Sequence, residues 1–346
     1  MRVLVTGAAG YIGSHASKRL LHDGHHVLAL DDLSRGHQTP MDLLKQSHPD
    51  RFTFAHGRLG DRVKVKSLVD DLKIDTVMHF GALAYVGESV DRPLRYYQNN
   101  VAGAIAMLEA LDCAESPIQR FIFSSSCATY GDPPDDLIPV PETCPQSPTS
   151  PYGRTKLHLE QILMDYADHR RAKGSPIALT MLRYFNVAGA DSSGILGEDH
   201  DPETHLIPIA IQCALGQRDH ISIFGTDYPT PDGTNIRDYV HVDDLVDAHL
   251  RAMERIEPGR TEAFNIGIGK GASVREVIEA VKRVSGSDFN VQEAPRRPGD
   301  AIALFADPSK IQSELGWSAQ HTDLDEIVRS AYDWMKAHPK GYDDKN

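Results

Sequence analysis

The chain has 346 residues, of which 40% are hydrophobic and 25% are charged, and its formal net charge is −13. This balance is typical of a globular protein, and the acidic charge argues against nucleic acid as a partner, because binding a phosphate backbone requires a clustered basic face. We expect no membrane span, since no run approaches about 18 apolar residues, and no secretory signal, since the chain starts with the strand-like run MRVLVTGAAG.

Short apolar, β-branched runs alternate with helical patterns through the first half of the chain. The predicted strands are Arg2–Thr6, Val27–Leu30, Phe52–His56, Thr76–Phe80, Phe121–Ser125 and Ala178–Phe185. The predicted helices between them are Ile12–Asp23, Arg62–Leu72, Pro93–Asp112 and Tyr152–Lys173. This alternation predicts an α/β fold with a doubly wound parallel sheet of the Rossmann type, covered by helices on both faces.

The pattern changes after about Asn186. Residues 190–203 and 228–234 are rich in turn-forming residues, and a helix is predicted over Val242–Arg255 with a strand at Ala263–Gly267. Ser273 and Glu276 have the spacing of a capping box before an apolar run. We therefore expect a first domain over residues 1–185, to which segments around 236–266 return. Residues 186–346 are expected to form mainly a smaller, mixed α/β substrate domain.

Gly7, Gly10 and Gly13 stand between the first predicted strand and the first predicted helix. A tight turn at this place lets backbone N–H groups meet a pyrophosphate at the helix N-terminus. The second strand ends at Asp31 and Asp32, where a carboxylate can accept both ribose hydroxyls and would repel a 2′-phosphate. The first domain is thus predicted to bind NAD in preference to NADP.

Tyr152 and Lys156 are four residues apart and share one face of a predicted helix. An ammonium near the phenol is expected to lower the tyrosine pKa from about 10, so that Tyr152 can act as a general base. Ser126 follows the fifth strand, at the carboxyl edge of the sheet where ligands bind, and its hydroxyl can share a proton with Tyr152. Tyr332 and Lys336 have the same spacing but no cofactor motif nearby. The motifs around Tyr152 and Lys156, and not the spacing alone, therefore indicate a catalytic role for the first pair.

Nine motifs along the chain extend this pattern. They are TGAAGYIGSH from Thr6, VGES from Val86, SSSCATYG from Ser124, SPYGRTK from Ser150, LRYFNVAGA from Leu182, GTDYPTPDGT from Gly225, RDYVHVDD from Arg237, RRPGD from Arg296 and LGW from Leu315. In them the chain resembles the extended short-chain dehydrogenase/reductase superfamily and, more closely, its UDP-glucose 4-epimerase (UDP-galactose 4-epimerase) family, almost end to end.

The resemblance implies reversible C4 epimerisation of UDP-glucose and UDP-galactose with a tightly bound NAD and a transient 4-keto sugar. It implies the catalytic residues Ser126, Tyr152 and Lys156. It implies cofactor contacts at Gly7, Gly10, Tyr11, Ile12, Gly13, Asp31, Asp32, Phe80, Asn99, Ser124, Tyr152, Lys156, Tyr184 and Phe185. It implies substrate contacts at Ser126, Tyr152, Asn186, Phe224, Arg237, Arg297, Asp300 and Leu304.

The expected partners are a UDP-sugar and a second copy of the chain, with no nucleic acid and no membrane. The homodimer is expected from the resemblance, through the helices Pro93–Asp112 and Tyr152–Lys173. No metal site is expected, because the 17 histidines are scattered without ligand spacing. Four scattered cysteines and the absence of an N-x-S/T sequon favour a cytoplasmic setting.

Several positions depart from the family pattern. Ala84 stands where the family has a lysine, His205 where it often has asparagine, and Asp32 and Arg35 where many members have asparagine. Leu304 falls where some members carry a tyrosine beside the hexose. A smaller residue there could admit an N-acetyl group, so an enzyme acting mainly on UDP-N-acetylhexosamine, or on UDP-xylose and UDP-arabinose, stays open.

Two other activities and one non-catalytic role occur on the same fold. A sugar-nucleotide 4,6-dehydratase needs an additional acid and base, whereas Cys127 and Ala128 follow Ser126. A net reductase would exchange NADPH at each turnover, and Asp31 disfavours it. A non-catalytic NAD-binding protein could lose the tyrosine–lysine pair, which this chain keeps.

Overall fold

The large sheet of the computed structural model, which describes residues 1–297 and 300–343, has within these residues seven strands in the order β10-β6-β5-β4-β1-β2-β3. The strands are β1 (Arg2–Thr6), β2 (His26–Asp31), β3 (Phe52–His56), β4 (Thr76–His79), β5 (Arg120–Ser126), β6 (Ala178–Tyr184) and β10 (Thr261–Ile266). Every neighbouring pair is parallel. The strand order reverses between β1 and β4, which makes their carboxyl ends the switch point where ligands bind in such sheets.

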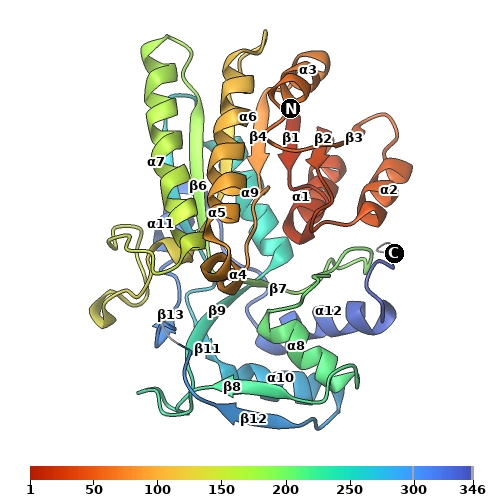
Figure 1. Cartoon of the computed structure of the whole chain (residues 1–346), viewed down its shortest axis with the longest axis vertical. Coiled ribbons are helices and arrows are strands. Elements are labelled where there is room, and N and C mark those ends of the chain that lie inside the picture. The colour runs from red at the N-terminus through yellow and green to blue at the C-terminus, as the bar shows by residue number, and fades with distance from the viewer. Residues whose placement is uncertain (298–299, 344–346) are drawn as a thin grey trace.

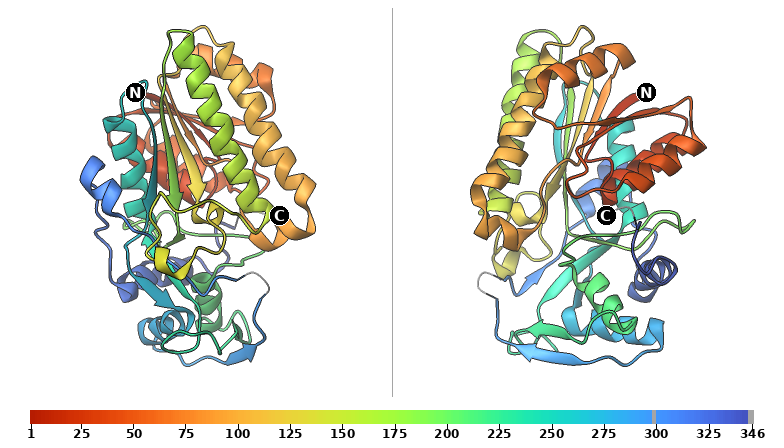
Figure 2. Two further views of the ribbon diagram at one scale, coloured as in Figure 1. Left: turned by 90° about the vertical axis from the view of Figure 1, so that its left-hand side faces the viewer. Right: turned by 45° about the vertical axis from the view of Figure 1, so that its right-hand side comes forward.

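Helices cover both faces of this sheet (Figures 1 and 2). On one face are α3 (Arg62–Leu72), α6 (Gly103–Asp112) and α7 (Pro151–Ala172), and on the other are α1 (Tyr11–His22), α2 (Gln38–Ser47), α9 (Val242–Arg255) and α11 (Ser309–Leu315). Strand residues alternate between the two cores, since Val3 and Val5 belong to one cluster and Leu4 to the other. The predicted fold class is confirmed, and β1, β3, α3 and α9 have the predicted bounds.

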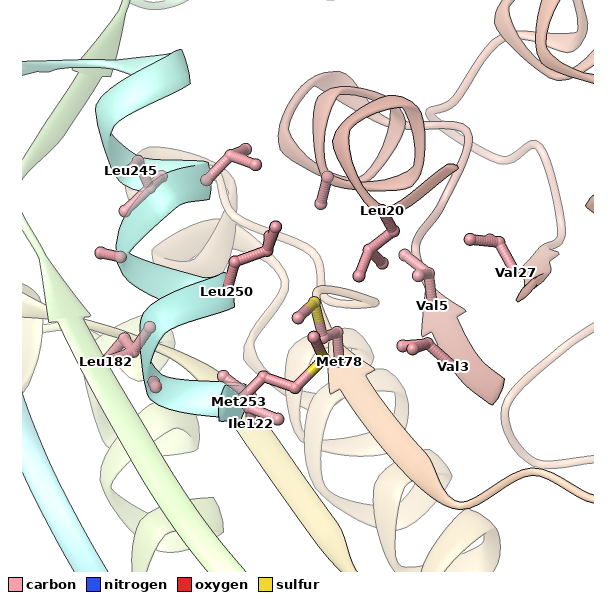
Figure 3. Packing of buried hydrophobic residues seen from close by; sticks show 14 of the residues in the cluster. Val3, Val5, Leu20, Val27, Met78, Ile122, Leu182, Leu245, Leu250 and Met253 are labelled. Atoms are coloured by element: carbon pink, nitrogen blue, oxygen red, sulfur yellow. The ribbon is translucent and has the colours of Figure 1, made fainter. Parts of the chain in front are cut away.

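A late segment of the chain completes the core of the early sheet. Figure 3 shows Leu250 and Met253 of α9 beside Met78 of β4 and Leu20 of α1, all of them buried. Burying a Leu or Met side chain contributes roughly 1.5–3 kcal/mol. Of residues 236–266, β10 therefore belongs to the large sheet and α9 packs on one of its faces, whereas β9 (Ile236–His241) lies in a separate, smaller sheet.

That smaller sheet forms the second region of the molecule, below the large sheet in Figure 1. It contains β11 (Gly271–Ser273), β9, β13 (Ala303–Leu304) and β7 (Asn186–Ala188), while β8 (Ile221–Phe224) pairs with β12 (Val291–Ala294). Three helices, α8 (Leu206–Ala214), α10 (Val274–Ser285) and α12 (Leu324–Ala337), share a third core. The capping box of α10 is confirmed, with Ser273 and Glu276 bonded reciprocally.

The predicted helix Pro93–Asp112 is confirmed in its bounds, but it contains a π-helical segment and is not a regular α-helix throughout. The chain forms α4 (Val86–Asp91), α5 (Pro93–Tyr96), a π-helical segment at Tyr97–Ala102 and then α6. Asn100 in the π-helical segment exchanges hydrogen bonds with the Leu83 backbone and donates to Thr155, at 2.8–3.1 Å. This buried amide ties the segment to the loop after β4 and to α7, and such π-bulges are frequent at functional sites.

Short 3₁₀ turns at Cys127–Thr129 and Asp135–Leu137 follow β5. Within the described chain, no helix combines the length and the apolar character that crossing a bilayer requires.

Candidate active site

A cavity of about 1370 Å³ opens at the carboxyl edge of the large sheet and reaches the second region. Pockets for one small molecule usually measure about 300–1,000 Å³, so this one has room for a second ligand. All of the predicted cofactor-binding residues line it: Gly7, Gly10, Tyr11, Ile12, Gly13, Asp31, Asp32, Phe80, Asn99, Ser124, Tyr152, Lys156, Tyr184 and Phe185.

The glycine loop after β1 forms a cradle whose close packing against neighbouring backbone leaves no room for a side chain at Gly7. Gly7 has φ +67°, and a Cβ atom on it would lie 2.7 Å from the backbone of Gly81. Among the described residues, Gly10 at the N-cap of α1 receives no side-chain cap, so the first N–H groups of the helix remain available. A backbone loop against an uncapped helix N-terminus suits the pyrophosphate of a dinucleotide.

Asp31 ends β2 and is held in place by the backbone. Its Oδ2 accepts a hydrogen bond from Ala9 N at 3.0 Å and its Oδ1 accepts one from Leu33 N at 2.8 Å. Burial raises the pKa of this carboxyl, although both hydrogen bonds oppose the change. Each carboxylate oxygen has a further lone pair for a ribose hydroxyl, as the sequence predicts for NAD.

The three predicted catalytic residues meet on one wall of the cavity. Ser150 caps α7 by accepting from Gly153 N at 3.1 Å, which begins the helix so that Tyr152 and Lys156 face the end of β5. Lys156 Nζ donates to Ser124 O at 2.6 Å and lies 5.8 Å from the ring centroid of Tyr152. Ser126 completes the group, since its hydroxyl is close enough to the Tyr152 phenol to lower the pKa of that phenol.

The expected lowering of the tyrosine pKa by Lys156 is not found. Burial raises the pKa of Tyr152 to about 12, which the nearby Ser126 hydroxyl only partly offsets. Burial also lowers the pKa of Lys156 to about 7, against the charge of Glu160. The ammonium is turned to the Ser124 carbonyl rather than the phenol, so desolvation dominates. A positive charge brought beside the phenol by a ligand would favour the phenolate.

On the opposite wall the predicted substrate residues are only partly brought together. Asn186, Arg237, Asp300 and Leu304 line the cavity. Arg237 is paired with Asp300 and also donates to Ala301 O at 2.9 Å and Ile236 O at 2.7 Å. The predicted anchor for a diphosphate is therefore engaged by a carboxylate from the second region.

Phe224 and Arg297 are the predicted substrate residues outside the described cavity lining, although the Arg297 carbonyl accepts a hydrogen bond from Asp300 N at 3.4 Å. The Arg297 guanidinium stacks 3.8 Å from the ring centroid of Phe224, and neither side chain belongs to the described lining of the cavity. Pro298 and Gly299 of the predicted RRPGD motif fall outside the described residues.

The cavity wall also contains a charged cluster that was not predicted from the sequence. Glu198, His200 and His205 line the cavity, and Glu203 contacts both histidines. Burial alone would lower both histidine pKa values, but the two glutamates raise the pKa of His200 to about 9 and that of His205 to about 10. The histidines are thus not all scattered: the spacing E-x-H-x-x-E-x-H from Glu198 was the available signal.

Arg35 occupies the space near Ala84, where the family lysine is missing. Its guanidinium lies 4.9 Å from the ring centroid of Tyr85, and it binds the carboxylate of Glu88 at 2.9 and 3.0 Å. Both Arg35 and Ala84 line the cavity.

Comparison with known proteins agrees with this geometry. The model of the NAD dependent epimerase/dehydratase family matches residues 3–267. The probable UDP-arabinose 4-epimerase 1 of Oryza sativa subsp. japonica is 46% identical, over 98% of this chain and 80% of that protein. The UDP-glucose 4-epimerase of Lactobacillus helveticus is 45% identical, over 100% of both chains.

A solved structure shows the same arrangement of the whole chain. The UDP-glucose-4-epimerase from Stenotrophomonas maltophila, crystallised with bound NAD and formylated UDP-arabinopyranose, is 40% identical and has a TM-score of 0.91, covering 98% of this chain and 99% of that one. The resemblance expected from the motifs is confirmed. The chain belongs to the NAD dependent epimerase/dehydratase family.

Proposed function

We propose that this chain is an NAD-dependent UDP-sugar 4-epimerase that interconverts UDP-glucose and UDP-galactose. The observation that carries the proposal is one cavity with a glycine cradle, the group Ser126–Tyr152–Lys156 and room for a second ligand. A dehydratase would need an additional acid and base, but Cys127 follows Ser126, and burial raises the pKa of its thiol to about 12.

The residues present fit NAD. The Gly7–Gly13 loop and the uncapped start of α1 would hold its pyrophosphate, Asp31 its adenosine ribose, and Lys156 its nicotinamide ribose. Bound NAD would supply a hydride acceptor and donor for C4 of the sugar. The acidic end of β2 would disfavour a 2′-phosphate.

Tyr152 is the proposed general base for the 4-hydroxyl of the sugar. Its phenol oxygen takes the proton, and the nearby Ser126 hydroxyl shares or relays that proton. Proton removal requires the phenolate, so the base works only when a cation beside the phenol lowers the pKa from about 12. This requirement couples proton transfer to the presence of oxidised cofactor.

Arg237 is the proposed anchor for the substrate diphosphate, with Asn186, Asp300 and Leu304 beside the nucleotide and the sugar. An enzyme that presents both faces of a sugar to one hydride carrier must hold the nucleotide firmly and the sugar loosely. The planar guanidinium suits phosphate, and it would exchange the carboxylate of Asp300 for phosphate oxygens. Phe224 is proposed to contact the uracil, and Arg297 is proposed to contact the diphosphate.

We further propose that residues 1–185, with α9 and β10, bind NAD, and that residues 186–346 mainly bind the UDP-sugar. A homodimer is proposed through α5, α6 and α7, because Leu94, Ile105 and Met164 expose 81%, 39% and 39% of their surface on these helices. We place the enzyme in the cytoplasm, since its four cysteines are unpaired thiols.

A second candidate function is 4-epimerisation of UDP-arabinose and UDP-xylose. It is favoured by the 46% identity to the probable UDP-arabinose 4-epimerase 1 of rice. The two candidates share the cofactor and the catalytic group, and they differ only in the preferred sugar.

Turnover without added cofactor tests the proposal. The purified protein should convert UDP-galactose to UDP-glucose, and the rate with UDP-arabinose measures the second candidate. A faster rate with UDP-arabinose would transfer the assignment to pentoses. A 4-keto-6-deoxy product, or no turnover of any UDP-sugar even with NAD supplied, would contradict 4-epimerisation.

A further inference from the structure

Four side chains of the loop between β7 and α8 converge on one point in the cavity wall. The Nδ1 atoms of His200 and His205 face carboxylate oxygens of Glu198 and Glu203, and the four atoms lie within 4.8 Å of one another. From His200 Nδ1 the distances are 3.1 Å to Glu198 Oε1 and 3.7 Å to Glu203 Oε2. From His205 Nδ1 they are 2.8 Å to Glu198 Oε1 and 3.1 Å to Glu203 Oε1.

These separations match the edges of a coordination tetrahedron. Zinc binds histidine nitrogen at about 2.0–2.1 Å and carboxylate oxygen at about 2.0–2.2 Å, so neighbouring ligand atoms lie about 3.3–3.6 Å apart. The four observed nitrogen–oxygen distances fall on both sides of that range. The separations not given by these four distances are within 4.8 Å, so side-chain shifts of at most about 1.5 Å would bring one atom of each side chain to the coordination distance of a central ion.

Hydrogen bonds between the same atoms cannot satisfy every contact. Each Nδ1 carries at most one proton but faces two carboxylates, and Glu198 Oε1 lies within reach of both rings. A central cation contacts all four atoms at once. The charge also fits, because the side chains of Glu198 and Glu203 are only 6% and 5% exposed, and a divalent ion would neutralise them with both imidazoles neutral.

Neighbouring groups orient these ligands. Glu203 Oε1 accepts from Thr204 N at 2.7 Å and from His205 N at 2.8 Å. The edges of the Tyr85 and Tyr11 rings meet His200, with centroids 5.9 and 6.3 Å away. A site whose ligands are fixed by outer partners loses little entropy when an ion binds.

A second group in the described chain, made of His241, Asp243 and His321, provides a comparison. His241 Nδ1 accepts from Asp243 N at 3.1 Å as the cap of α9, and its Nε2 contacts Ser330 Oγ at 3.1 Å. The Asp243 carboxylate lies 4.0 Å from that Nδ1. Both nitrogens of this imidazole are engaged in the fold, so the group is a control rather than a second candidate.

We propose that Glu198, His200, Glu203 and His205 form a binding site for one divalent first-row transition ion, with zinc the best match. Two imidazoles and two carboxylates suit such ions, whereas magnesium and calcium prefer oxygen ligands throughout. The ion would hold residues 198–205 of the loop between β7 and α8 in one conformation. The proposal does not depend on the epimerase assignment, because metal binding itself is the readout.

Metal binding by the full chain tests it. The purified protein, stripped with a chelator, should retain one equivalent of Zn²⁺ after equilibrium dialysis, and Co²⁺ in its place should give the visible absorption of a tetrahedral site. Zn²⁺ should also raise the thermal midpoint, because an ion that binds only the folded state stabilises it. Failure to bind either ion at stoichiometric concentrations would show that the four residues form ion pairs only, and would overturn the proposal.

Variants locate the ion. His205→Gln removes a half-exposed ligand and should weaken Zn²⁺ binding by more than the roughly 10–100-fold caused by loss of an outer partner. Glu203→Gln keeps the shape of the side chain and should do the same, which guards against a folding defect in either variant. His321→Gln, in the control group, should bind Zn²⁺ like the parent. Unchanged binding in both His205→Gln and Glu203→Gln, or loss of binding in His321→Gln, would refute the site.

Discussion

The two walls of the cavity are held by different forces. On the wall made by the large sheet, Ser126, Tyr152 and Lys156 are 8% exposed or less, and Lys156 is bonded to strand backbone. On the opposite wall Arg237 is held by Asp300, with side chains 15% and 25% exposed. The first wall is formed before any ligand arrives, while the second consists of charges that a ligand can exchange. The residues of the first wall are therefore positioned by the fold, whereas Arg237 of the second wall is positioned by an ion pair.

Removing the phenol hydroxyl of the proposed base tests the role of the first wall most directly. Tyr152→Phe should lower the epimerisation rate by about 10²–10⁴-fold, because general base catalysis contributes that much. Tyr332→Phe, which alters the tyrosine of the other pair with the same spacing, should leave the rate unchanged. The comparison is read from initial rates with UDP-galactose at matched protein concentrations. Equal rates for Tyr152→Phe and the parent would remove Tyr152 from the mechanism.

The buried ion pair behind the first wall tests how firmly that wall is held. Arg183 and Glu160 are 8% and 1% exposed, and Arg183 reaches both carboxylate oxygens at 2.9 and 2.7 Å. Glu160→Ala should cost about 3–5 kcal/mol of unfolding free energy, because it leaves a buried guanidinium unpaired. The exposed pair Arg296–Asp227 of the second region is the control, and Asp227→Ala should leave urea unfolding unchanged. Similar losses in both variants would contradict the contrast between the walls.

Acid titration distinguishes the regions by sign. Burial lowers the pKa of His249, under the large sheet, to about 4, so its contribution to stability is lost as pH falls from about 6.5 to 4. Burial raises the pKa of Asp238, in the small sheet, to about 6, so stability rises as pH falls from about 6 to 4. Each shift corresponds to about 3 kcal/mol.

Single variants separate these opposing contributions. Relative to the parent, His249→Phe should become more stable as pH falls through this range, and Asp238→Asn should become less stable. Unfolding by urea at several pH values between 4 and 7 measures both trends. Parallel trends in the two variants would show that the burial of one of these groups does not control its titration.

The smallest expected effect is on substrate affinity at the second wall. Arg237→Gln should raise the KM for UDP-galactose about 10–100-fold with a small change in kcat, since hydrogen bonds to charged groups contribute roughly 1.5–3 kcal/mol. Arg296→Gln, whose arginine pairs with Asp227 outside the cavity lining, is the matched control. A fall in kcat at unchanged KM would instead place Arg237 in the chemical step.

Local signals made the first wall predictable from the sequence. The glycine loop, the cap at Ser150 and the spacing of Tyr152 and Lys156 each lie within a few residues, and the structure brings them to one cavity. The pKa of Tyr152 could not be predicted in the same way. It depends on how deeply the phenol is buried and on where Lys156 points, which the packing of α7 on β5 decides.

The second wall depends on partners distant in sequence. The β9 strand pairs with β7, β11 and β13, and none of these short strands was predicted. The helix α8 is an almost wholly apolar run containing Pro208, so it has no amphipathic pattern to reveal it. Stacking of Arg297 on Phe224 likewise depends on the pairing of β8 with β12, which no local spacing shows.

Two of the connections between the large-sheet region and the second region have almost no linker residues. One residue, Phe185, separates β6 from β7, and α9 begins at the residue after β9. A hinge needs a few loop or element-terminal residues whose φ and ψ angles can change, and at these two crossings only Phe185 and the junction of β9 with α9 are in such positions. These short connections therefore limit how far the two walls of the cavity can move apart. A ligand longer or thicker than the cavity would therefore require the φ and ψ angles at these short connections to change.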